Sequence, residues 1–155
     1  MQMSPMVADL ARNVGLSSLK RAAGLVTRLL PIGQPTMLVG PGASERLGQA
    51  VNDFGHRKIL IVTDAVIAKL GLMDSMTDAL TAGGTQFVVY DEVTPDAPLH
   101  LIEKGIEIYK SEDCDAIIAF GGGSAMDAAK TIALAATNHK NPRQLVGYFK
   151  GLRAP

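Results

Sequence analysis

The sequence has no tryptophan, a single cysteine and few aromatic residues. Aromatic side chains make up 5% of its 155 residues and apolar side chains 47%, so we expect an aliphatic, alanine-rich core of the kind found in α/β proteins. Cys114 stands alone, which excludes an internal disulfide and suits a reducing, cytoplasmic compartment. Because Cys114 lies just before a predicted buried strand, we expect it to be a packing residue rather than a reactive thiol.

Long apolar runs and a strong net charge are also missing. No stretch approaches the roughly 18 apolar residues that cross a bilayer, and the N-terminus lacks the apolar segment of a secretory signal. We therefore expect no membrane association. The formal net charge is zero, and nothing in it indicates a nucleic-acid partner. Residues 128–155 carry five basic and no acidic side chains, so this end can face an acidic partner or a phosphate.

Histidine is scarce as well. The three histidines are His56, His100 and His139. None is paired with another at the i, i+4 spacing that places two ligands on one helical face, and they fall near the ends of different predicted elements. The sequence therefore predicts no three-histidine metal site.

The most informative feature that is present is a glycine-rich run, Gly121-Gly122-Gly123-Ser124, between a strand-like and a helix-like segment. Glycines let the backbone approach an anion closely, and the free N–H groups at a helix start point toward it. Ser124 and Asp127 have the spacing of a capping box, which predicts that the helix begins at Ser124. The pattern favours a phosphate-binding turn over a plain strand–helix connection.

This run departs from the usual dinucleotide fingerprint. That fingerprint has a third glycine where this chain has Met126, and an acidic residue about 20 positions later that holds a ribose hydroxyl. After Asp127 the sequence contains no acidic residue. If a dinucleotide binds, the acid that holds its ribose must come from another strand.

Apolar periodicity and turn residues predict alternating strands and helices from Pro35 onward. An open, mainly parallel, Rossmann-like sheet with helices on both faces follows from this alternation. The predicted strands are 36–39, 58–63, 86–90 and 116–120, and the predicted helices are 44–54, 65–82 with a break near Gly71, 99–110, 124–136 and 142–150. We expect residues 1–34 to be an extension with an amphipathic helix at 16–30, and residues 35–155 to be the α/β domain.

Ligands of open parallel sheets bind beyond the carboxyl ends of the strands. Asp64 follows the strand at 58–63, and Thr94, Pro95 and Asp96 follow the strand at 86–90. Asp64 is the best candidate for the ribose acid, because a carboxylate accepts hydrogen bonds from a 2′,3′-diol and repels a 2′-phosphate. This choice favours NAD over NADP. The alternative is that Asp64 only caps the helix after it.

In their order along the chain, these motifs resemble the iron-dependent (group III, metal-containing) alcohol dehydrogenases. The resemblance rests on Thr63-Asp64, on the Tyr90–Pro95 run Tyr-Asp-Glu-Val-Thr-Pro, and on the Gly121–Lys130 run Gly-Gly-Gly-Ser-Ala-Met-Asp-Ala-Ala-Lys. The Gly40-Pro41-Gly42 turn fits as well. The resemblance covers about Pro35 to Lys150.

This resemblance implies NAD(P)-dependent interconversion of small alcohols with aldehydes or ketones. It implies that Asp64 holds the adenosine ribose, that Gly122, Gly123 and Ser124 hold the pyrophosphate, and that Asp127 lies beside the nicotinamide half. It also implies a homodimer through N-terminal edge strands. In the family, iron or zinc is held by one Asp and three His of an all-helical C-terminal domain.

That metal-binding domain is absent from this sequence, so we expect a truncated, cofactor-binding half that is inactive alone. The family's Pro-Asn-Pro reads Pro95-Asp96-Ala97-Pro98 here, which puts the contact at the Asn position in doubt. A glycerol dehydrogenase-like or dehydroquinate synthase-like relative is an alternative, and a non-enzymatic nucleotide-binding or interaction module is another.

Overall fold

The computed structural model describes residues 36–145. The chain divides into two compact units, Met1–Met37 and Leu38–Pro155, and every element below belongs to the second. In chain order these elements are α2 (Ala43–Asp53), β1 (Lys58–Val62), α3 (Ala65–Lys69), α4 (Asp74–Ala82), β2 (Gln86–Tyr90), α5 (Leu99–Ser111), β3 (Ala116–Ala119), α6 (Gly123–Asn138) and the 3-10 helix η1 (Pro142–Leu145). The helix predicted over 16–30 lies outside the described residues.

The sheet is parallel throughout, with the strand order β2-β1-β3. β1 lies in the middle: Ile59 pairs with Phe87 of β2 on one side and with Ala116 of β3 on the other. The last four residues of β1 are completely buried, as expected for a strand covered on both faces, which reads as a continuous apolar run. The predicted α/β class with a parallel sheet is confirmed.

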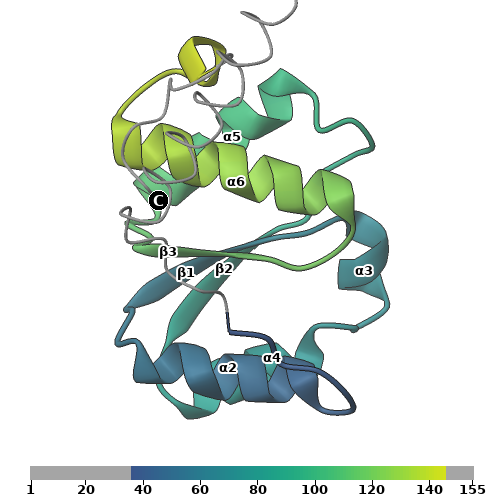
Figure 1. Ribbon diagram of the computed structural model, residues 1–155. Helices are drawn as coiled ribbons and strands as arrows, with labels where there is room; N and C mark the ends of the chain where they lie inside the picture. Colours follow the sequence, from purple (N-terminus) through teal and green to yellow (C-terminus); the bar gives the residue numbers. More distant parts are fainter. Residues whose placement is uncertain (1–35, 146–155) are drawn as a thin grey trace, which may run out of the picture. The chain divides into compact units, whose positions relative to one another are not determined.

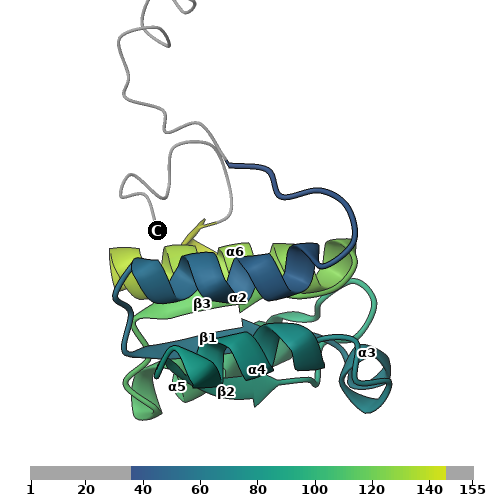
Figure 2. The ribbon, with the colours of Figure 1, turned by 90° about the horizontal axis from the view of Figure 1, so that it is seen from below.

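Helices cover both faces of this sheet, α2 and α4 on one side and α5 and α6 on the other (Figures 1 and 2). Successive side chains of a strand point to opposite faces, so β1 supplies two separate cores. Leu60 and Val62 pack into the core with α5 and α6. Ile59 and Ile61 pack into the core with α2 and α4.

α2 and α4 approach each other closely because Gly48 has no side chain. A Cβ atom at Gly48 would lie 2.6 Å from the carbonyl oxygen of Met76 and 2.8 Å from Cβ of Ala79. Asn52, one turn further along α2, donates from Nδ2 to the carbonyl of Ala79 at 2.9 Å. A glycine and an amide together therefore fix the distance between these two helices.

Several predicted boundaries are wrong for local reasons. Residues 36–39 form no strand in the described structure, because no described segment pairs with them. α2 begins at Ala43, one residue before Ser44, since Gly42 in the left-handed conformation occupies the N-cap. The break predicted near Gly71 is confirmed, with separate helices α3 and α4. Of the helix predicted over 142–150, residues 142–145 form the 3-10 helix η1 and the rest lies outside the described residues.

Candidate functional site

The carboxyl ends of the three parallel strands meet at one edge of the sheet. Asp64 follows β1, Asp91 and Glu92 follow β2, and Gly121 follows β3. Asp64 and Glu92 form an isolated antiparallel bridge, which ties the chain beyond β1 to the chain beyond β2. The predicted site residues therefore gather at the edge where open parallel sheets bind ligands.

Gly121 turns the chain from β3 toward α6 in a backbone conformation that requires glycine. Its φ angle is +149°. A Cβ atom here would lie 3.1 Å from Cβ of Ala125, 3.2 Å from Cδ1 of Ile67 and 3.7 Å from Oδ2 of Asp64. The structure thus brings Asp64 and the glycine run together, as predicted, and adds Ile67 as a neighbour. Ile67 was missed because nothing in its local sequence distinguishes it from an ordinary helix residue.

The start of α6 is open. Its N-cap is Gly122, and no described side chain caps the helix, so the prediction that Ser124 is the capping residue is wrong. The first N–H groups of an α-helix have no partner within the helix. Cβ atoms placed at Gly122 or Gly123 would meet nothing within 4 Å. The result is a row of backbone donors, at the positive end of a helix dipole, that a ligand can reach.

Asp64 caps α3 with one carboxylate oxygen and leaves the other oxygen available to a ligand. Its Oδ1 atom accepts hydrogen bonds from the backbone N–H groups of Val66 and Ile67, both at 3.0 Å. Its Oδ2 atom is the one that lies toward Gly121. The capping role that the sequence left open is therefore present. It holds the carboxylate in one orientation and leaves its second oxygen facing the glycine run.

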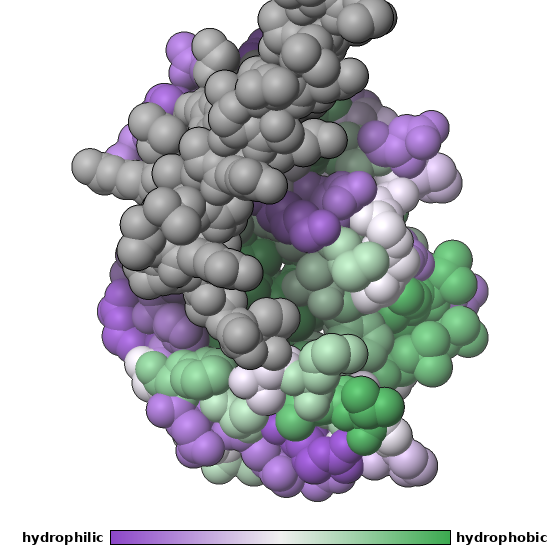
Figure 3. Space-filling view, viewed as in Figure 1, coloured by the Kyte–Doolittle hydropathy of each residue, from purple (hydrophilic) through white to green (hydrophobic). Residues whose placement is uncertain are grey.

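The segment 65–72 after Asp64, which contains α3, exposes apolar side chains. Val66, Leu70 and Leu72 are 66%, 65% and 56% exposed, and Figure 3 shows the corresponding apolar surface where α3 lies at the right of the molecule. This surface adjoins the site.

Thr94, Pro95 and Asp96 form an exposed turn beyond β2. The N–H of Ala97 donates to the carbonyl of Thr94 at 3.1 Å, and Asp96 and Ala97 have φ angles of 65° and 40°. Because β1 lies between β2 and β3, this turn stands across β1 from the glycine run. Asp127, the last predicted residue, lies in the second turn of α6, exposed and 3.4 Å from Nζ of Lys130.

Several polar groups lie near the carboxyl ends of β1 and β2. Tyr90 is buried, and its hydroxyl donates to the carbonyl of Leu101 at 2.7 Å. Burial, with a smaller contribution from Glu92, raises the pKa of Tyr90 to about 12. Nζ of Lys104 on α5 holds both carboxylate oxygens of Glu92, at 2.6 and 2.7 Å. Oγ1 of Thr63 is buried and has no hydrogen-bond partner among the described residues.

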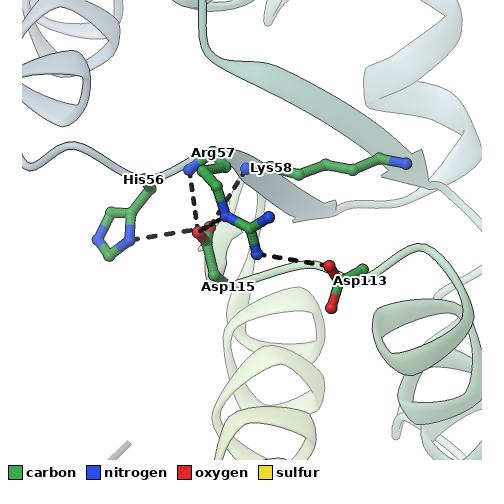
Figure 4. A network of polar contacts seen from close by, with 5 residues as sticks. All are labelled: His56, Arg57, Lys58, Asp113 and Asp115. Carbon is green, nitrogen blue, oxygen red and sulfur yellow. Dashed lines mark hydrogen bonds and ion pairs between the residues drawn. The ribbon is translucent and has the colours of Figure 1, made fainter.

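The opposite edge of the sheet carries a different network, centred on Asp115 (Figure 4). Its carboxylate accepts from the backbone N–H groups of Arg57 at 3.0 Å and Lys58 at 3.2 Å, and lies 3.9 Å from Nδ1 of His56. Burial alone would raise the pKa of Asp115, but the two backbone donors and the neighbouring cations outweigh it, so this pKa lies below its ordinary value. Asp115 joins the start of β1 to the start of β3.

Metal ligands do not gather in the part of the chain that the structure describes. Within residues 36–145 no group of three or more His, Cys, Asp or Glu side chains is arranged to hold an ion. His56 precedes β1, His100 lies in the first turn of α5 and His139 follows α6. Over the same residues, no helix is long and apolar enough to cross a bilayer. Cys114 is buried, as predicted, and forms no disulfide.

Residues 34–154 match the sequence profile of a family described as iron-containing alcohol dehydrogenase. Choline dehydrogenase of Bacillus subtilis (strain 168) is 40% identical over 105 residues, and NAD-dependent methanol dehydrogenase of Bacillus methanolicus is 34% identical over 104 residues. Each match covers 67% of this chain, but only 26% and 27% of the respective relatives.

Solved structures agree with the sequence comparisons. NADH-dependent butanol dehydrogenase A from Thermotoga maritima is similar with a TM-score of 0.70 at 28% identity, over 81% of this chain and 32% of that one. A 1,3-propanediol oxidoreductase gives a TM-score of 0.66 at 32% identity, over 70% and 28%. The fold, the ordered motifs and these likenesses together place the chain in the iron-containing alcohol dehydrogenase family.

Proposed function

We propose that this chain is the nucleotide-binding part of a dehydrogenase that interconverts alcohols with aldehydes or ketones, and that it binds NAD(H) at the carboxyl edge of its sheet. The observation that carries the proposal is the meeting of Asp64 with the glycine run. One carboxylate oxygen faces Gly121, beside an uncapped helix start. A dinucleotide needs both groups close together, because backbone N–H groups at a helix start bind its pyrophosphate and a carboxylate binds its ribose diol.

The pyrophosphate would lie against Gly122, Gly123 and Ser124. The open space at the two glycines lets phosphate oxygens come within hydrogen-bond distance of the backbone N–H groups. Asp127 is one turn further along α6 and exposed, which suits a place beside the nicotinamide half. The ring, when bound, supplies the hydride acceptor, and the residues of this chain position it.

Asp64 would hold the adenosine ribose. The α3 N-terminus fixes its Oδ1, so Oδ2 can accept a hydrogen bond from a 2′- or 3′-hydroxyl without a change of rotamer. The same charge repels a 2′-phosphate, which favours NAD over NADP. Thr94, Pro95 and Asp96 stand across β1 and would border the cofactor from that side.

The described residues do not fit the iron or zinc that the family implies, because no suitable ligand group exists within 36–145. We therefore assign no metal-dependent step to them. Metal, substrate and the alcohol-binding surface would belong to the larger part of the relatives' length that this chain does not span. The buried, unpaired Cys114 agrees with a reducing, cytoplasmic location, which we also propose.

Calorimetry with NADH and NADPH tests the proposal. We expect the chain to bind NADH more tightly than NADPH. Asp64→Asn keeps an oxygen to cap α3 and removes the charge, so the preference should narrow by about tenfold, or about 1.4 kcal/mol. Asp78→Asn, on the exposed side of α4, is the matched control and should leave the preference unchanged.

Two results would contradict this assignment. Tighter binding of NADPH by the unmodified chain would remove the ribose role of Asp64. Absence of binding by either nucleotide, in a chain that folds by circular dichroism, would overturn the proposed cofactor site as a whole.

A further inference from the structure

The carboxyl edge of the sheet is acidic where β1 and β2 end. Asp64, Asp91, Glu92 and Asp96 all follow these two strands. Glu92 differs from the ribose candidate Asp64 in that it is bonded to a basic side chain, Lys104 of α5. The charge that a bound nucleotide meets at this edge therefore depends on that ion pair as well as on Asp64.

Glu92 and Asp64 lie opposite each other where the chain leaves β1 and β2. They form an antiparallel bridge, and the N–H of Val93 donates to the carbonyl of Thr63 at 3.3 Å. This hydrogen bond flanks the bridge, as it does in the narrow, non-hydrogen-bonded pairs of antiparallel strands. The Cβ atoms of such a pair lie about 4.5–5.5 Å apart on one face. The side chain of Glu92 therefore starts beside that of Asp64.

Both carboxylates belong to the α5 and α6 side of the sheet. Oδ2 of Asp64 lies toward Gly121, which precedes α6. The carboxylate of Glu92 reaches Nζ of Lys104 on α5. A phosphate on the 2′-oxygen of a ribose held by Asp64 would therefore lie in the combined field of Asp64, Glu92 and Lys104.

Lys104 neutralises Glu92 and stays within reach of a ligand. Its Nζ atom bonds to the two carboxylate oxygens at 2.6 and 2.7 Å. The side chains of Lys104 and Glu92 are 47% and 49% exposed. Like charges placed directly opposite each other across a strand pair are destabilising. Without Lys104, Glu92 and Asp64 would repel each other and would together repel a further anion.

We propose that the Glu92–Lys104 pair sets the net charge beside the adenosine ribose, and with it the strength of discrimination between NADH and NADPH. This inference rests on the proposed function. In the paired state the charges of Glu92 and Lys104 cancel, so the rejection of a 2′-phosphate comes mainly from Asp64. Lys104 is thus a specificity-determining residue that acts through charge and takes no part in hydride transfer.

The proposal predicts shifts of opposite sign when either partner loses its charge. Glu92→Gln keeps the size of the side chain and frees the ammonium of Lys104 to attract a 2′-phosphate. The NADPH dissociation constant divided by that of NADH should then fall by about threefold to tenfold. Lys104→Met leaves Glu92 uncompensated, so the same ratio should rise by a similar factor. The NADH constant should change less than the NADPH constant, because its 2′-hydroxyl is uncharged.

The double variant Glu92→Gln/Lys104→Met separates this role from a purely structural one. It removes both charges, so the ratio should return close to that of the unmodified chain. If the pair only fastened α5 to the end of β2, both single variants and the double variant would lose the same contact and shift the ratio in the same direction.

Calorimetric titration of each variant with NADH and NADPH, at low salt and at about 1 M salt, measures these ratios. Both shifts should shrink at high salt, since half-exposed charges are screened there. Glu112→Gln, which breaks the ion pair with Lys58 near the opposite edge of the sheet, is the control for Glu92→Gln. Lys110→Met, at an exposed position further along α5, is the control for Lys104→Met. Neither control should change the ratio.

The outcomes distinguish this inference from the proposed function. Nucleotide binding with an unchanged ratio in both single variants, or with shifts of the same sign in both, overturns the role of the Glu92–Lys104 pair and leaves the proposed function standing. If the unmodified chain is folded by circular dichroism and binds neither nucleotide, the proposed cofactor site fails and this inference fails with it.

Discussion

Gly121 and Gly122 are neighbours in sequence, yet a methyl group would act differently at each. At Gly121 the added Cβ meets Ala125 and Ile67 in a backbone conformation that side chains disfavour. At Gly122 it meets nothing and φ is −80°. We expect Gly121→Ala to lower the free energy of unfolding by about 1–3 kcal/mol. Gly122→Ala should leave stability nearly unchanged and still weaken NADH binding, because the methyl occupies the space for phosphate.

Thermal unfolding and calorimetry on both variants separate the two effects. The expectation for Gly122 fails if NADH binds Gly122→Ala as tightly as the parent chain. Equal unfolding midpoints for Gly121→Ala and the parent would show that the turn accepts a side chain.

Asp115 makes stability depend on pH in the acid range. Its pKa is lowered in the folded chain from an ordinary value of 3.8, so its contribution is fully present above that value and is lost as pH falls through the lower, folded pKa. Asp115→Asn should cost about 1 kcal/mol at neutral pH, a figure reduced for partial exposure. The difference between parent and variant should shrink below pH 3.8. Urea unfolding of both chains at several pH values measures this difference in the free energy of unfolding. A difference that stays constant with pH would contradict the role of Asp115.

Single residues also mark the limit of what the sequence could predict. Asp64 had two readings, ribose acid and helix cap, and the structure shows the cap made by one oxygen while the other remains free. The two readings are thus compatible, which spacing alone could not reveal. Ser124 was expected to cap the helix because serine is preferred over glycine at the N-cap and because Asp127 has the spacing of a capping box. In the structure the helix begins earlier, and Gly122 occupies the N-cap.

At the scale of elements, the contact between α2 and α4 depends on one missing side chain. Alanine favours a helix over glycine by about 1 kcal/mol, but at Gly48 its Cβ would collide with the carbonyl oxygen of Met76. We expect Gly48→Ala to destabilise the chain by about 1–2 kcal/mol net, since overpacking outweighs the helix preference.

Chemical denaturation of Gly48→Ala and of the control Gln49→Ala, an exposed neighbour on the same helix, measures this loss of stability. Gln49→Ala should change the denaturation midpoint little. A more stable Gly48→Ala would mean that the two helices can separate without penalty.

Short apolar runs were easiest to predict. β1 and β2 appear in the sequence as unbroken apolar runs bounded by polar or glycine residues, and their limits are within one residue of the prediction. Thr36–Val39 has the same local character but no pairing partner among the described residues. A strand is a property of two segments, so composition at one of them was insufficient. For the same reason the sequence could not specify the strand order.

For the whole molecule, we expect no alcohol dehydrogenase activity from this chain alone, with or without added iron or zinc. The physical reason is the lack of a metal-ligand group among the described residues. Spectrophotometric detection of NADH formation with a series of primary alcohols is the measurement. Turnover that requires added metal, and that Asp64→Asn diminishes, would contradict the expectation.

The central place of β1 also bears on the order in which the chain folds. Ile59 pairs with Phe87 and with Ala116, so the loop that brings β3 to β1 is roughly twice as long as the loop that brings β2. Its closure entropy is greater by about 0.6 kcal/mol, and during synthesis β3 also emerges last. The unit of β1 and β2 therefore has the earlier opportunity to form. Gly121 meets Asp64 only after β3 has joined, so a nascent chain cannot form the proposed nucleotide site before β3 has paired with β1.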